Sequence, residues 1–309
     1  MTLRDACKPE NFAWESELAD AYHFTNENGF IRTVLHYQIP LPENKQVFFM
    51  TKYGLRGSDL RQFYQNLVRC LQQEVAVSKY LTRARVSSVL SFSAMEQARD
   101  EAGTSHIYLE TEQIWPVIGK VLVNPTPYIT VMDVIYRLSI VLRDISKDSV
   151  GVVHRGLDLN EVYINNEDRI KVGGFFYSYC PDVYGWPDYL PNRPSNLPMG
   201  FLNGEKGHQG LDIMTLALIA WNLFSGNPHD AKLVDGRWVF PAYANQELVD
   251  ALFLGMSGNE ENCQSFRRRW QDCRKQMSKT EFASMTLPIR KQLLKEVSVE
   301  YVVIPEEPG

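Results

Sequence analysis

The sequence predicts an α+β fold in which a β-rich part with one long helix precedes a mainly helical part. Alternating apolar and polar residues, which are typical of half-buried strands, recur before residue 112. Apolar residues at intervals of three and four, which are typical of amphipathic helices, dominate after Pro127. The run Ile213–Phe224 is apolar on all sides, which predicts a helix buried in a core.

In the first part, the runs Gly29–Ile39 and Gln46–Tyr53 alternate, and the turn-rich link between them predicts a β-hairpin. Apolar residues at helical spacing predict an amphipathic helix of about six turns over residues 58–81. The apolar stretches Val86–Phe92 and His106–Thr111 predict two further strands. The polar segment 94–104 between them predicts a loop.

In the second part, helical spacing predicts helices over residues 131–145, 245–256 and 262–277. The tail predicts one more helix over residues 288–297 and a β-branched, strand-like run over residues 299–304.

The composition is that of a globular protein, with 44% hydrophobic residues, 22% charged residues and a formal net charge of −5. A strongly basic surface is missing, so we expect no nucleic-acid partner. The longest apolar run is too short to span a bilayer, and the amino end lacks the pattern of a signal peptide. The five scattered cysteines have no metal-binding spacing and are expected to be reduced thiols. We therefore expect a soluble, cytoplasmic protein without a transmembrane segment.

Four sequence landmarks resemble those of protein kinases. Residues 152–164 read VVHRGLDLNEVYI, which resembles the catalytic loop HRDLxxxN, and residues 169–175 read RIKVGGF, which resembles the strand leading into DFG. Residues 197–199, Leu-Pro-Met, stand where the family has APE. Leu211-Asp212-Ile213 resembles the start of a buried helix of the family, whose aspartate would accept hydrogen bonds from the backbone of the catalytic loop.

The resemblance implies a bilobal, protein-kinase-like fold. The regions that we expect are an amino-terminal extension, a β-rich N-lobe, a mainly helical C-lobe and a carboxy-terminal extension, at residues 1–21, 22–112, 113–277 and 278–309.

Compared with the family pattern, this sequence has other residues at the positions that perform phosphoryl transfer. The catalytic base position is Gly156, and the metal-binding aspartate of DFG is Gly174. The loop asparagine that holds a metal is Glu161, and the loop lysine is Asp158. The resemblance therefore implies an inactive kinase homologue, or pseudokinase, with no metal site and with weak or absent ATP binding. As an alternative, Asp158 could act as a displaced base and Glu161 could hold a metal, which would give a nucleotide sensor or a low-activity kinase.

The amino-terminal half also departs from the pattern. Residues 29–34 resemble part of the glycine-rich loop, with Glu27 and Arg32 at two glycine positions. Lys52 is the candidate strand lysine. Glu74 lies on the apolar face of the first helix and needs a cationic partner, for which Lys52 is the candidate. This pair is interpreted either as a remnant of nucleotide positioning or as a structural ion pair.

Two more segments have positions in the family pattern. Thr111 and Glu112 would form the gatekeeper and the hinge beside the ATP site. Arg267, Arg268 and Arg269, the candidate partners of the lost APE glutamate, are either free for a partner or form a solvated helix face.

Aromatic residues gather at the position of the activation segment, on a stretch rich in proline. They either bind a partner, since such side chains lose little entropy on binding, or pack back into the cleft. The candidates for partner binding are Tyr177, Tyr179, Tyr184, Trp186 and Tyr189.

These features predict a catalytically inactive scaffold or allosteric regulator that binds other proteins in signalling and has no cofactor. The KVGGF and Thr-Glu…Trp-Pro segments have a more distant similarity to the Scy-like pseudokinases.

Overall fold

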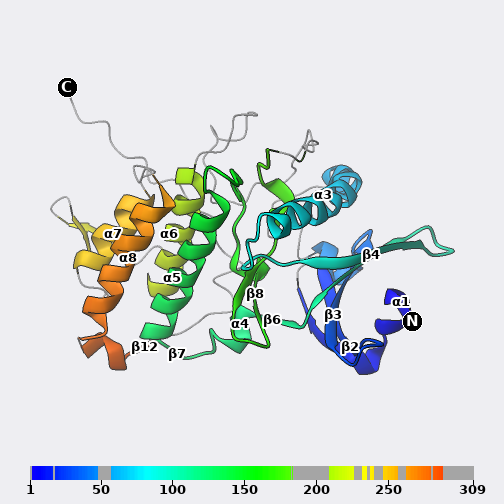
Figure 1. Ribbon diagram of the computed structural model, residues 1–309, viewed down its shortest axis with the longest axis horizontal. Helices are drawn as coiled ribbons and strands as arrows, with labels where there is room; N and C mark the ends of the chain where they lie inside the picture. Colours follow the sequence, from blue (N-terminus) through cyan, green and yellow to red (C-terminus); the bar gives the residue numbers. More distant parts are fainter. Residues whose placement is uncertain are drawn as a thin grey trace.

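A computed structural model describes the protein over residues 2–16, 18–47, 57–181, 183, 209–225, 232–234, 237–239, 246–256, 262–279 and 281–287. A five-stranded sheet lies at one end of its longest axis and a group of helices lies at the other (Figure 1). A three-stranded sheet lies between them. The predicted α+β class is confirmed.

The five-stranded sheet is antiparallel throughout and has the order β1-β2-β3-β5-β4. Its strands are β1 (Phe12–Glu15), β2 (Ala19–Thr25), β3 (Ile31–Ile39), β4 (Phe92–Arg99) and β5 (Ser105–Glu112). The boundary that we expected at residue 22 falls inside β2, because residues 12–15 and 19–21 already belong to the sheet.

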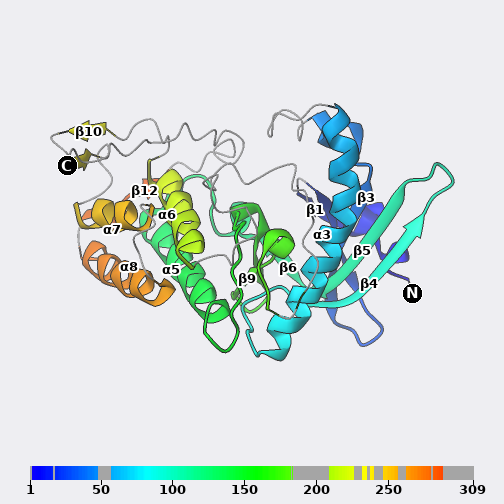
Figure 2. The same cartoon turned by 90° about the horizontal axis from the view of Figure 1, so that it is seen from above.

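Two helices cover opposite faces of this sheet. The long helix α3 (Gly57–Arg83) packs Leu67 and Leu71 against Leu35 of β3. The short helix α1 (Leu3–Ala6) packs against Val34 and its neighbours on the other face (Figures 1 and 2). Successive residues of a strand point to opposite faces, so even-numbered residues of β3 face α1 and odd-numbered residues face α3. The helix predicted over residues 58–81 is confirmed.

Two strand predictions are wrong. Residues 43–47 form a helical turn, and β3 pairs with β2 and β5 on its two edges, so it has no edge left for a hairpin with residues 46–53. Residues 48–56 lie outside the described ranges. The apolar stretch from Val86 is a buried connection rather than a strand: Leu90 N–H donates to Val172 O at 2.8 Å. The strand β4 begins only at Phe92 and runs through the predicted loop, whereas the strand predicted at His106–Thr111 is confirmed as β5.

The three-stranded sheet has the order β6-β8-β9 and joins the two ends of the molecule. Its strands are β6 (Ile114–Pro116), β8 (Val162–Asn165) and β9 (Ile170–Val172). The other short elements of the described residues are η1 (Pro9–Asn11), α4 (Val117–Lys120), β7 (Thr126–Pro127), η2 (Leu159–Glu161), η3 (Phe175–Tyr177), β10 (Lys232–Val234), β11 (Arg237–Val239), η6 (Glu281–Ser284) and β12 (Thr286–Leu287).

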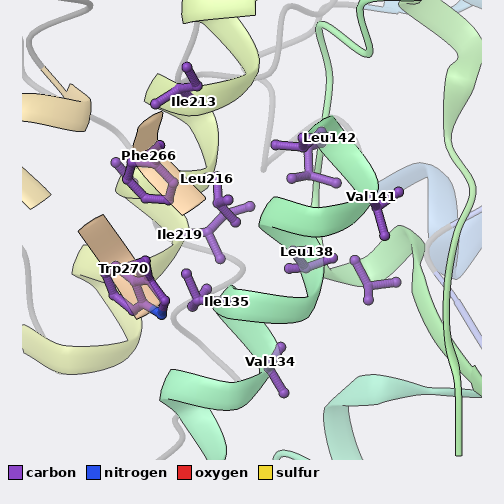
Figure 3. Packing of buried hydrophobic residues seen from close by; sticks show 14 of the residues in the cluster. Val134, Ile135, Leu138, Val141, Leu142, Ile213, Leu216, Ile219, Phe266 and Trp270 are labelled. Carbon is purple, nitrogen blue, oxygen red and sulfur yellow. The ribbon is translucent and has the colours of Figure 1, made fainter. Parts of the chain in front are cut away.

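The predicted helices of the second part are confirmed as α5 (Tyr128–Ile145), α6 (Gln209–Ser225), α7 (Gln246–Met256) and α8 (Cys263–Met277). Leu138 of α5, Leu216 of α6 and Trp270 of α8 point into one shared core and are fully buried (Figure 3). Because α6 packs against both α5 and α7, its predicted burial on all sides follows from its central place. The elements predicted at 288–297 and 299–304 lie outside the described residues.

Candidate functional site

The candidate site is built around the loop that follows α5, where the catalytic-loop resemblance begins. His154 is fully buried, and its Nε2 lies 2.9 Å from the carbonyl oxygen of Gly173. A carbonyl only accepts, so Nε2 donates. Burial lowers the pKa of His154 to about 4, and the imidazole is therefore neutral at physiological pH. His154 thus ties the loop to the strand that precedes Gly174.

Asp212, in the first turn of α6, anchors the same loop. Its carboxylate accepts the backbone N–H groups of His154 and Arg155, each at 2.8 Å. This confirms the hydrogen bonds that we expected for Asp212. Burial raises the pKa of Asp212 to about 6, and the two donors oppose this shift by stabilising the charged form.

The residues of this loop that depart from the protein kinase pattern have local structural roles. Gly156 is buried and supplies no side chain. Asp158 caps η2, because its carboxylate accepts the backbone N–H of Asn160 at 2.9 Å. Glu161 accepts the hydroxyl of Tyr163 at 3.0 Å. The two carboxylates proposed as a displaced base and a metal ligand are thus engaged in holding this segment.

Gly174 has a left-handed backbone, with φ +76°, and Glu161 covers it. A Cβ atom at this position would lie 2.7 Å from Glu161 Cγ and 2.8 Å from Glu161 Cβ, which is closer than carbon atoms pack. The position therefore excludes a side chain for two separate reasons, the backbone conformation and the covering glutamate.

Replacing Gly174 with alanine is expected to lower the free energy of unfolding by about 2–4 kcal/mol, as the sum of a left-handed conformation and overpacking. Gly29 provides the matched control, because it has φ +78° with no atom within 4 Å of an added Cβ. Gly29→Ala is expected to cost only about 1 kcal/mol. Urea unfolding of both variants measures the difference, and equal losses would show that Glu161 does not restrict Gly174.

Glu74 of α3 reaches the same glycine from the other side. It is 2% exposed, and its Oε1 accepts the backbone N–H of Gly174 at 3.0 Å. Burial raises the pKa of Glu74 to about 8, so the carboxyl group is largely protonated at neutral pH. Over the described residues no ion pair involves Glu74, and Lys52, its expected partner, lies outside them. Protonation of the Glu74 carboxyl group, rather than pairing with a described cation, therefore accompanies its burial.

Aromatic side chains pack between the five-stranded sheet and the β8–β9 hairpin. Tyr163 of β8 is 2% exposed, and its ring centroid lies 5.6 Å from that of Trp14 of β1. Tyr37 of β3 belongs to the same cluster. Burial, followed by the charges of Glu161 and Glu74, raises the pKa of Tyr37 well above its ordinary value. We call Trp14, Tyr37 and Tyr163 the aromatic cluster.

Sequence reasoning missed all three members of the aromatic cluster. Trp14 fell in the expected extension, and Tyr163 lies inside the catalytic-loop resemblance but was not singled out. Tyr37 alternates with polar residues on β3 and shares the odd-numbered face of that strand with Leu35. This alternation was the available signal that Tyr37 is buried.

The segment expected to form the glycine-rich loop does not lie at the candidate site. Arg32 is even-numbered and shares the α1 face of β3 with Val34, away from α3. Its guanidinium forms an ion pair with Glu110 at 3.0 Å and donates to Ser93 Oγ at 2.7 Å. Residues 29 and 30 therefore lead into β3, residues 31–34 form its first part, and Arg32 does not reach the candidate site.

Of the expected gatekeeper and hinge residues, Glu112 connects the two sheets. Thr111 is fully buried and donates its hydroxyl to Ser91 O at 2.9 Å. Glu112 forms an ion pair with Lys171 at 2.6 Å and accepts from Asn165 Nδ2 at 2.7 Å. These contacts hold β5 against the β8–β9 hairpin.

Two of the five aromatic candidates for partner binding are described, and both contact the rest of the chain. Tyr177 is half-buried against the α3-facing core of the sheet. Tyr179 pairs its backbone with Val153, and the guanidinium carbon of Arg155 lies 5.7 Å from its ring centroid. Tyr184, Trp186 and Tyr189 lie outside the described ranges, as do residues 197–199.

The three arginines of α8 differ in their surroundings. Arg267 donates to Tyr136 Oη at 3.2 Å and to Gln264 Oε1 at 3.1 Å, whereas the side chains of Arg268 and Arg269 are exposed. Arg267 is therefore engaged within the protein.

All five cysteines are free thiols, as expected. In the described part of the chain, no cluster of three or more His, Cys, Asp or Glu side chains could hold a metal ion. None of the described helices combines the length and the apolar character needed to cross a membrane. Comparison with models of known protein families gives no match, and comparison with curated proteins finds no relative.

Proposed function

We propose that the chain is a pseudokinase: a bilobal, protein-kinase-like protein that transfers no phosphoryl group and acts by binding other proteins. The observation that carries this proposal is the environment of Gly174. At the position where protein kinases hold Mg²⁺, the backbone N–H is bound by Glu74 and the space beside the Cα is filled by Glu161.

Contacts between the sequence landmarks support the resemblance. Gly173 and Asp212 lie 19 and 58 residues from His154 along the chain, yet each forms a hydrogen bond with it. If the sequence match were accidental, these landmarks would not be expected to lie in contact in the fold. Among the described residues, a sheet with one long helix at one end and a group of helices at the other end is compatible with a bilobal kinase-like fold and supports the proposal.

The chemistry of phosphoryl transfer argues against activity. It depends on a base and on metal ions that neutralise the phosphates. Gly156 supplies no base, and the carboxyl groups of Asp158 and Glu161 serve as a helix cap and as an acceptor for Tyr163. Carboxylates without a metal would repel a nucleoside triphosphate.

A thermal-shift titration tests this proposal. We expect the melting temperature to stay unchanged with ATP at about 1 mM, with or without Mg²⁺ or Mn²⁺, because a dissociation constant above about 10 mM stabilises by less than ~0.1 kcal/mol. A saturable, metal-dependent rise would contradict the proposal and favour the nucleotide sensor that uses Asp158 and Glu161. If ATP stabilised the protein without a metal and without turnover, the chain would still be an inactive kinase homologue, but the proposal that its nucleotide site is empty would be wrong.

The binding of other proteins is assigned to the aromatic segment beyond Tyr179, in the setting of cytoplasmic signalling. The test is affinity purification with the full chain and with a Tyr184, Trp186 and Tyr189 triple serine variant. A partner that is lost with this variant but retained with Phe30→Ser, an exposed aromatic residue on the sheet, supports the assignment. Retention by both variants would place the binding surface elsewhere.

A further inference from the structure

Two histidines form a hydrogen-bonded pair on the α1 face of the sheet. His36 of β3 and His106 of β5 stack with ring centroids 5.2 Å apart and an interplanar angle of 17°. Nε2 of His36 lies 2.9 Å from Nδ1 of His106, and Nε2 of His106 lies 3.3 Å from Asp100 Oδ2. Asp100 also accepts the backbone N–H of Thr104 at 2.8 Å and so shapes the β4–β5 turn.

The carboxylate fixes the direction of these hydrogen bonds. Asp100 accepts, so Nε2 of His106 carries a proton, and a neutral His106 has a bare Nδ1. Nδ1 then accepts from His36, whose proton must be on Nε2. In the neutral pair, both imidazoles are Nε2–H tautomers and the donors run from His36 through His106 to Asp100.

The surroundings decide where an added proton is most stable. On the His106 side the neighbouring charge is the Asp100 carboxylate, in direct contact. On the His36 side, Asp20 of β2 favours a positive charge, whereas Lys45 disfavours it. Burial, then His106, lowers the pKa of His36 to about 4. Other titratable groups on this face are Tyr22 on β2, Tyr108 on β5, Glu96 on β4 and Cys7 beside α1.

We propose that His36 and His106 form a proton-responsive pair that binds one proton as a unit and links strand β3 to the β4–β5 turn. When the proton is added at Nδ1 of His36, the shared proton moves from His36 Nε2 to His106 Nδ1. His106 becomes the imidazolium, bonded to Asp100 on one side and donating to His36 on the other. His36 stays neutral and changes to the Nδ1–H tautomer.

The proposal predicts opposite effects for the first and second protons. The first proton converts a neutral hydrogen bond into a charge-assisted one, which is about twice as strong. A second proton would place N–H groups on both facing nitrogens at 2.9 Å and break the contact. Mild acidification therefore tightens the link between β3 and the turn, and strong acidification releases it.

Imidazole ¹⁵N NMR of the unaltered protein tests this directly between pH 8 and pH 5. We expect His36 to pass from the Nε2–H to the Nδ1–H tautomer over the same pH range in which both nitrogens of His106 become protonated. A scalar coupling between the two facing nitrogens should persist through this step. Independent titrations, with His36 retaining its Nε2 proton or taking the charge itself, would overturn the proposal.

Variants test whether the tautomer change of His36 depends on its partner His106 or on the general surroundings of the sheet. In His106→Gln, the tautomer change of His36 should disappear. His23→Gln is the control, because His23 contacts Ile114 O at 3.1 Å and lies outside the pair. An unchanged tautomer switch of His36 in His106→Gln would also overturn the proposal.

Discussion

Replacing Asp212 with alanine is expected to lower the free energy of unfolding by about 3–5 kcal/mol. The substitution leaves the buried N–H groups of His154 and Arg155 without an acceptor, and each such group costs about 1–3 kcal/mol. Asp212 is itself fully buried, so the lost side chain also leaves a small cavity in the core. Chemical denaturation at pH 7 measures the change.

Two further variants isolate the role of the carboxylate. Asp212→Asn keeps the shape but turns an amide donor toward one of the two N–H groups, so a loss of about 2 kcal/mol is expected. Asp272→Ala, on the exposed surface of α8, should change stability by less than about 0.5 kcal/mol. If Asp212→Ala were as mild as Asp272→Ala, the carboxylate would not anchor the loop.

The helices could be predicted from the sequence because their signal is local. Every apolar position of α5 that repeats at three- and four-residue spacing is buried in the structure, and in α6 every apolar residue of the run Ile213–Phe224 except Leu218 is buried. The strand errors have a physical cause. Val86 and Leu90 are apolar because they are covered by α3 and β9, and β4 is polar because it lies on the edge of the sheet.

The candidate site could be predicted only in part. The bonds of Asp212 to the backbone of His154 and Arg155 were expected from the resemblance of the sequence landmarks to a known family. The contact of Trp14 with Tyr163 joins residues from opposite halves of the chain, and no local pattern reports such a pairing. Glu74 was correctly placed on a buried helix face, but its amide donor comes from Gly174, which carries no side chain that could have suggested it.

Replacing Glu74 with glutamine is expected to stabilise the protein, and to do so increasingly as the pH rises. The unfolded glutamate titrates near 4.5, whereas burial raises its pKa in the folded chain to about 8. Between these values the folded chain holds a proton that the unfolded chain has released, so the stability of the unaltered protein falls as the pH rises. Glutamine keeps the shape and the acceptor for Gly174 and has no proton to lose.

The size of the effect follows from the same difference. We expect Glu74→Gln to be neutral near pH 4.5 and to add about 2–3 kcal/mol at pH 7.5, which is somewhat below the full linkage value. Urea unfolding of both proteins at several pH values measures it, with Glu101→Gln as the matched control for the same substitution at an exposed position. Destabilisation by Glu74→Gln at high pH would mean instead that the carboxylate is charged and paired. Lys52 would then be the residue to replace next, because loss of its charge should cause the same destabilisation.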